Sequence, residues 1–170
     1  GLEKYTKDVT VIPHCINFDI FNNFNRSKEN TKKILYVGRI VEEKGIGQII
    51  NLINSKYFYD QNLEWWFVGE GNLSDELRQL EKQNNNIKYF GKISSQRDLA
   101  SIYKQSDILL LPSIPSKKWE ELFGIVLIEA MACGVVPIST SNVGPKTIIS
   151  HLHDGFLYEY TDTEMLKNNI

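Results

Sequence analysis

The sequence predicts an α/β protein with a Rossmann-like, three-layer α/β/α sandwich and a mainly parallel sheet. Two observations support this fold class. Apolar strand patterns alternate along the chain with helical patterns, and several predicted strands are apolar at nearly every position, as in Ile108-Leu109-Leu110-Leu111. Strands of that kind suit a sheet covered by helices on both faces. Repeated βα units imply parallel strands joined by right-handed crossovers. The 170 residues suffice for one domain with a core.

The elements follow from local patterns along the chain. Short apolar runs rich in β-branched and aromatic residues predict strands at 9–12, 34–37, 65–68, 87–90, 108–111, 135–139 and 156–158. Helical spacing predicts helices at 45–53, 73–82, 96–104, 125–133 and, shorter, near 145–150. Ser95 followed by Asp98 resembles a capping box. Residues 18–33 are Asn-rich and predict a surface loop, and 162–170 predict a helix that the end of the sequence cuts short.

Composition excludes several classes of function. The hydrophobic share of 42% and charged share of 24% are those of an ordinary globular protein. A formal net charge of −2 gives no general attraction to nucleic acid or anionic lipid, so any anion site must be local. No apolar run approaches the roughly 20 residues that span a bilayer, and no signal-peptide pattern opens the sequence. Cys15 and Cys133 stand in unrelated contexts and indicate reduced thiols in a cytoplasmic protein.

Ligands of open α/β sheets bind beyond the carboxyl ends of the strands, so the loops there are the candidate sites. The loop after 34–37 contains Gly38, Arg39 and Lys44. The Arg39 guanidinium would bind phosphate oxygens, Lys44 would add a mobile charge, and Gly38 would let the backbone approach a ligand. The alternative is an ordinary loop in which both cations are solvated and paired with Glu42 or Glu43.

The next two loops carry weaker signals. Gly69-Glu70-Gly71 resembles part of a dinucleotide fingerprint, but Ser74 stands where the third glycine belongs, so a tight turn is the preferred interpretation. Gly91 would let backbone groups meet the edge of a nucleobase, and a simple βα turn is the alternative.

The strongest signal is the segment 121–134, in which Glu121 and Glu129 are separated by seven residues. Glu121 ends a long polar loop, where Trp119 either lines a site or covers the sheet, and Glu129 stands in an apolar helix. The helix N-terminus between the two acids has unpaired N–H groups that attract anions. A carboxylate among apolar residues is seldom buried alone, so Glu129 needs either a cation such as Arg39 or Lys44, or ligand hydroxyls. Two acids and a phosphate-binding helix end would suit a nucleotide-activated sugar.

These motifs together resemble the C-terminal, donor-binding half of a retaining glycosyltransferase with the GT-B fold, in the family named glycosyl transferases group 1. Segment 11–17 resembles the family's V-I-P-N-G-V-D, and 38–45 its G-R-x(4)-K-G loop. Residues 68–71 resemble its V-G-x-G element and Phe90-Gly91 resembles its base-contacting F-x-G region, and 121–134 matches E-x-F-G-x(4)-E-A-M-A-x-G. The sequence departs from the pattern at His14-Cys15, at Leu122, and at Thr147, where an acid is expected.

The resemblance implies a role for each matching residue. Arg39 and Lys44 would bind the donor diphosphate and stabilise charge on the leaving group, and Glu121 would hold a hydroxyl of the donor sugar; these three form the implied catalytic set. Glu129 would accept hydrogen bonds from the ribose hydroxyls. The remaining implied donor contacts are mainly from backbone, at Gly38, Gly91, Lys92, Phe123, Gly124 and Ile125.

The implied activity is sugar transfer, with retention, from a nucleoside diphosphate sugar to an acceptor glycan or glycolipid in bacterial capsule, lipopolysaccharide or other cell-surface synthesis. No cofactor is expected. No Asp-x-Asp motif is present, so the two cations would replace a metal. Residues 1–170 would form the donor-binding domain, binding donor weakly and transferring nothing without the preceding acceptor domain. That domain would also supply any membrane contact, leaving a cytoplasmic protein, peripheral at the inner face of the membrane.

Three rival functions use a similar fold. A non-catalytic nucleotide-sugar module would keep Arg39 and Lys44 without transfer. A sugar epimerase of related fold would use the same cleft, although the Ala-Met-Ala after Glu129 argues against it. A nicotinamide dehydrogenase is disfavoured by the incomplete glycine fingerprint. Donor sugar, base and acceptor are not readable from the sequence.

Overall fold

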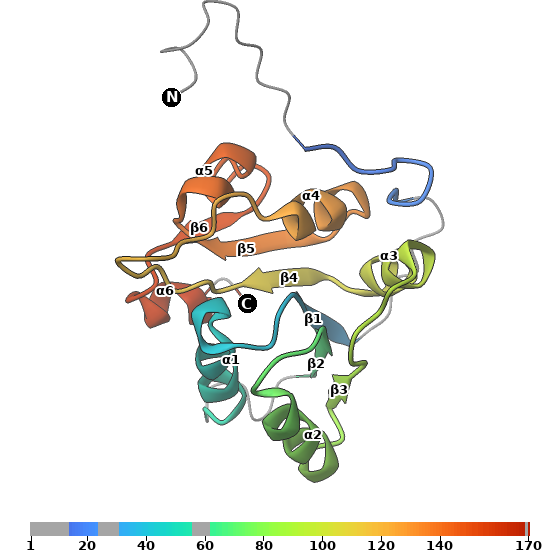
Figure 1. Ribbon diagram of the computed structural model, residues 1–170, viewed down its shortest axis with the longest axis vertical. Coiled ribbons are helices and arrows are strands. Elements are labelled where there is room, and N and C mark those ends of the chain that lie inside the picture. The colour runs from blue at the N-terminus through green and yellow to red at the C-terminus, as the bar shows by residue number, and fades with distance from the viewer. Residues whose placement is uncertain (1–13, 24–30, 56–61, 169) are drawn as a thin grey trace, which may run out of the picture.

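The computed structural model describes residues 14–23, 31–55, 62–168 and 170. Within them lies a six-stranded, entirely parallel sheet of order β3-β2-β1-β4-β5-β6 (Figure 1). The strands are β1 (Lys32–Val37), β2 (Leu63–Val68), β3 (Ile87–Tyr89), β4 (Ile108–Leu111), β5 (Val136–Thr140) and β6 (Phe156–Tyr158). The predicted Rossmann-like α/β class is therefore confirmed. The predicted strand 9–12 lies outside the described residues.

Helices connect the strands in the expected alternation. They are the 3-10 turn η2 (Glu42–Lys44) and the α-helices α1 (Ile46–Ile53), α2 (Ser74–Gln83), α3 (Gln96–Gln105), α4 (Ile125–Ala132), α5 (Val143–Ile148) and α6 (Thr163–Asn168). The Ser95 side chain accepts a hydrogen bond from the Asp98 N–H at 3.3 Å, which confirms the predicted N-cap of α3. The helix predicted near 145–150 begins two residues earlier, because Pro145 occupies its first turn, where a missing N–H costs nothing.

Two apolar layers sandwich the sheet, as the alternating side chains of β1 show. Ile34 and Tyr36 belong to one cluster, together with residues of α1, α2 and α6. Leu35 and Val37 face the other cluster, which includes residues of α3 and α4. The continuously apolar strands were therefore a correct sign of burial on both faces.

The strand order changes direction between β1 and β4. From β1 the chain builds outward through β2 and β3, and then returns to place β4 on the other side of β1 before adding β5 and β6 (Figure 1). The loops that follow β1 and β4 consequently lead away from each other. This leaves a crevice at the carboxyl ends of these two adjacent strands. In the part of the chain that the structure describes, every helix is too short or too polar to span a lipid bilayer.

Candidate functional site

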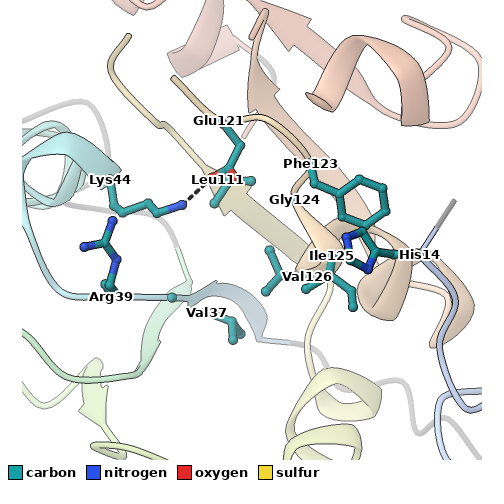
Figure 2. A pocket seen from close by; sticks show the side chains of 11 residues that line it. His14, Val37, Arg39, Lys44, Leu111, Glu121, Phe123, Gly124, Ile125 and Val126 are labelled. Carbon is teal, nitrogen blue, oxygen red and sulfur yellow. Dashed lines mark hydrogen bonds and ion pairs between the residues drawn. The ribbon is translucent and has the colours of Figure 1, made fainter. Parts of the chain in front are cut away.

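A pocket of about 340 Å³ occupies this crevice (Figure 2). It is built from the end of β1 and its loop, the end of β4, the loop before α4, the first residues of α4, and His14. The lining residues are His14, Val37, Gly38, Arg39, Lys44, Leu111, Glu121, Phe123, Gly124, Ile125 and Val126. Seven of the ten residues singled out from the sequence thus meet in one cavity; Gly91, Lys92 and Glu129 lie outside its lining.

The loop after β1 is held by backbone contacts. The Tyr36 hydroxyl donates a hydrogen bond to the Arg39 carbonyl at 2.6 Å, and burial raises the pKa of Tyr36 above its ordinary value, so it remains a donor. Gly69, at the end of β2, packs so closely that an added Cβ would lie 1.8 Å from the Gly38 carbonyl oxygen. The Gly-x-Gly segment therefore has the turn-and-packing role preferred from the sequence.

Lys44 turns into the pocket. It ends η2, and its ammonium forms an ion pair with Glu121, from the loop after β4 (Figure 2). The same nitrogen lies 5.0 Å from the centre of the Trp119 ring, a cation–π distance, so Trp119 lies at the site. The Glu121 carboxylate also accepts a hydrogen bond from the Ser113 hydroxyl at 3.3 Å.

The alternative of an ordinary charged surface loop is therefore wrong for Lys44. Its side chain is only 15% exposed and pairs with an acid 77 residues away in the chain, rather than with Glu42 or Glu43. Arg39 is exposed on the same wall of the pocket, and within the described residues no carboxylate pairs with it. The site therefore holds one neutralised and one available cation.

The opposite wall is the start of α4. Gly124 precedes the helix in the left-handed conformation, with φ 81°, and no side chain caps the helix. The first helical N–H groups consequently have no partner within the helix, and they carry the positive end of its dipole. Because Ile125 and Val126 line the pocket, this end of α4 is available to an anion there.

His14 is a lining residue whose place was not predicted. Its ring centre lies 4.4 Å from that of Phe123, with 59° between the ring planes. In the sequence, His14 is distinguished only as a departure from the family's Asn. That replacement of a polar residue in a recognisable motif is the one sign in the sequence that position 14 is unusual. The contact with Phe123 is visible only in the tertiary structure.

Glu129 is buried on α4 at 9% exposure, and its carboxylate accepts a hydrogen bond from the Tyr103 hydroxyl of α3 at 2.9 Å. Burial raises the pKa of Glu129, while the hydrogen bond from Tyr103 acts to lower it. The alternative of an ion pair with Arg39 or Lys44 is wrong: Lys44 bonds Glu121, and no cation pairs with Glu129 among the described residues. The partner within the described residues is the Tyr103 hydroxyl, which neither sequence-based alternative included.

The raised pKa of Glu129 predicts a pH-dependent stability. An acid whose pKa is raised by folding contributes stability only while protonated, and loses it as pH rises through the raised pKa. We expect Glu129→Gln to melt above wild type at pH 8, and the two melting temperatures to converge toward about pH 4, near the ordinary pKa of Glu. Thermal unfolding across this range measures the effect, with exposed Glu159→Gln as the control. A difference independent of pH would contradict the assignment.

Gly91 and Lys92 lie beside the pocket rather than in it. Gly91 lines a separate hollow of about 360 Å³ with Tyr89 and Phe90. Its carbonyl accepts a hydrogen bond from the Gly69 N–H at 2.8 Å, and Gly69 in turn contacts Gly38, so the three glycines connect the two hollows. Lys92 is exposed. Within the described part of the chain, no three His, Cys, Asp or Glu side chains gather as metal ligands.

The parallel sheet and the pocket at its reversal point define a domain of the C-terminal GT-B class. A crystal structure of the C-terminal domain of a glycosyl transferase group 1 protein from Francisella tularensis shares this fold, with a TM-score of 0.73 at 23% identity over 91% of this chain and 85% of that one. The chain belongs to the family Glycosyl transferases group 1, which matches residues 17–170.

Curated relatives and a ligand complex give this family membership its context. An uncharacterized glycosyltransferase of Methanocaldococcus jannaschii is 32% identical over 78% of this chain and 34% of its own length. A UDP-Gal:α-D-GlcNAc-diphosphoundecaprenol α-1,3-galactosyltransferase of Escherichia coli is 27% identical over 94% of this chain and 43% of its own length. The Anabaena protein HepE, solved in complex with UDP and glucose, superposes with a TM-score of 0.64 at 21% identity. The match covers 82% of this chain and 38% of the HepE chain. The chain therefore spans less than half the length of these curated relatives.

Proposed function

We propose that this chain is the donor-binding half of a retaining glycosyltransferase, and that it binds a nucleoside diphosphate sugar in the pocket between β1, β4 and α4. The observation that carries the proposal is the convergence of Arg39, Lys44 and the α4 N-terminus on one cavity. Two cations and a helix dipole facing one space suit a diphosphate. The complex of HepE with UDP and glucose supports a uridine nucleotide as the leading candidate.

The electrostatics of the pocket suit the leaving group of this reaction. Charge grows on the diphosphate as the glycosidic bond breaks, and positioned cations stabilise that charge without a metal. Lys44 is already oriented by Glu121, Ser113 supports Glu121, and Trp119 lies at cation–π distance from the ammonium. In this proposal Glu121 also binds a donor-sugar hydroxyl, so it links the sugar to the cation that meets the diphosphate.

The rest of the donor would extend along α4. Glu129 would accept hydrogen bonds from the ribose hydroxyls, and backbone at Gly91 and Lys92 would contact the base. The main-chain N–H groups near Phe123, Gly124 and Ile125 would meet sugar or phosphate oxygens. This arrangement follows the order of groups in a nucleotide sugar, with the hollow at Gly91 beyond the diphosphate pocket.

We further propose that the longer protein transfers the sugar to a cell-surface glycan or glycolipid. The galactosyltransferase relative, whose name specifies a diphosphoundecaprenol-linked acceptor, supports that class of substrate. Acceptor binding and any membrane contact are assigned to a second domain, and the donor domain to the cytoplasm. We therefore expect these 170 residues alone to transfer no sugar; measurable transfer by them would contradict that part of the proposal.

Calorimetric titration with UDP, GDP and ADP tests the donor assignment. We expect at least one of the three nucleotides to bind at up to millimolar concentration. Glu129→Ala should weaken the binding of that nucleotide more than the binding of pyrophosphate, because only the nucleotide has a ribose. Circular dichroism confirms that each variant is folded. Absence of binding by all three nucleotides to the folded chain would contradict the donor role, and equal loss for nucleotide and pyrophosphate would contradict the ribose role.

A further inference from the structure

We propose that Tyr103 is a positioning residue for the nucleotide site: its buried hydroxyl holds one oxygen of Glu129, so that the other oxygen faces the ribose hydroxyls of the donor. This inference rests on the proposed function, because it assumes that a nucleotide occupies the crevice. It adds a residue of α3, outside all of the recognised motifs, to the machinery of the site.

The Tyr103 side chain has little freedom to move. It is fully buried at 0% exposure, and its ring packs edge-on against Phe21 with centroids 6.1 Å apart and 71° between planes. Its hydroxyl reaches across from α3 to α4 and donates to Glu129 Oε2 at 2.9 Å. A ring fixed by packing delivers its hydroxyl to one place, so the carboxylate it bonds is fixed as well.

The two oxygens of Glu129 have different surroundings. Oε2 accepts the bond from Tyr103, and no bond to Oε1 is present within the described residues. Since no fully buried side-chain oxygen in that part of the chain lacks a partner, Oε1 reaches solvent. One oxygen is therefore held by the protein while the other is open to a ligand. Burial raises the pKa of Glu129, and the hydrogen bond from Tyr103 opposes that rise, so it favours the charged, accepting form relative to burial alone.

The position of Glu129 on α4 agrees with a ribose that follows the diphosphate. Val126 lines the pocket, and Glu129 comes three residues later on the same helix. Residues with this spacing share a helix face, with Cβ atoms about 5–6 Å apart. The carboxylate thus lies about one turn beyond the pocket wall, at the next step along a nucleotide whose phosphates meet the helix end.

Binding of UDP, 2′-deoxy-UDP and pyrophosphate to Tyr103→Phe tests the proposal; GDP or ADP and its deoxy form replace the uridine pair if that base binds better. Without Tyr103 to position it, the Glu129 carboxylate should lose its hydrogen bond to the ribose. Loss of that one charged hydrogen bond predicts about a tenfold weaker affinity for UDP. Pyrophosphate affinity should stay unchanged, and the preference for UDP over 2′-deoxy-UDP should shrink. In a Glu129→Ala background, Tyr103→Phe should have no further effect on UDP. Tyr158→Phe, another buried tyrosine in the opposite core cluster, is the matched control and should bind all three ligands as wild type does.

Different results would overturn the positioning role of Tyr103 and the proposed donor-binding function. The positioning role is overturned if Tyr103→Phe weakens the binding of UDP and pyrophosphate equally. It is also overturned if Tyr103→Phe binds both with wild-type affinity while Glu129→Ala no longer binds UDP. Either result leaves the donor site intact. Failure of the wild-type chain to bind any nucleoside diphosphate overturns the proposed function itself. A structure of the wild-type chain with UDP gives a test that needs no variant: Tyr103 should still bond one Glu129 oxygen while the ribose bonds the other, and a complex in which they separate would overturn the inference.

Discussion

Replacing Lys44 with alanine is expected to weaken nucleoside diphosphate binding by about ten- to a hundredfold, the loss of one charge-assisted contact worth about 1.5–3 kcal/mol. The effect should exceed that of Arg39→Ala, because Lys44 is only 15% exposed and already oriented by Glu121, whereas Arg39 is exposed and must lose more side-chain freedom on binding. Calorimetric titration at two salt concentrations measures the effect. The affinity of the wild type should fall with added salt more steeply than that of the variant.

Two further variants separate binding from stability. Lys44→Ala leaves the Glu121 carboxylate buried without its cation, which should lower both stability and anion affinity. Adding Glu121→Gln removes that charge, so the double variant should regain stability without regaining wild-type affinity. Lys88→Ala removes a cation paired with Glu64 at 3.7 Å on the surface, and should leave binding unchanged. Wild-type affinity in Lys44→Ala would refute a diphosphate at this wall.

Gly45→Ala is expected to be the most destabilising of these changes, by about 3 kcal/mol. Gly45 has φ 76°, a left-handed conformation that costs another residue about 1–2 kcal/mol. Its added Cβ would also lie 1.9 Å from the Pro112 carbonyl oxygen, which adds about 1–3 kcal/mol of overpacking. The melting temperature should fall by about 6–12 °C. Gly45 joins Lys44 to α1, and Pro112 begins the loop that carries Glu121. The clash would therefore push apart the two loops that bring Lys44 and Glu121 together.

Two glycines provide matched controls for Gly45→Ala. Gly91 also has positive φ, 65°, but no atom lies within 4 Å of an added Cβ, so Gly91→Ala isolates the conformational cost of about 1–2 kcal/mol. Gly47 lies inside α1, where an added Cβ has ordinary contact at 3.4 Å, so Gly47→Ala should stabilise by about 0.5–1 kcal/mol. Equal losses for Gly45→Ala and Gly91→Ala in thermal unfolding would show that contact with Pro112 contributes nothing.

The sequence determined the elements whose signals are local. Continuous apolar runs located β4 at Ile108–Leu111 and β6 at Phe156–Tyr158 without error, and the Ser95 cap located the start of α3. Ordered motifs across the chain also predicted that the loops after β1 and β4 would share a site. These signals are readable because backbone periodicity and capping depend on neighbours within a few positions.

Only the tertiary structure decided how the site side chains pair. Glu129 meets Tyr103 rather than a cation, Lys44 turns to Glu121 rather than to Glu42 or Glu43, and His14 packs on Phe123. Each pair joins residues far apart in the chain, such as the 77 positions between Lys44 and Glu121, which strand order and packing bring together. Charge and spacing along a sequence identify which groups need partners. The choice among partners depends on which strands are adjacent, because all the strands of a parallel sheet end at the same edge and only adjacent ones bring the loops that follow them into contact.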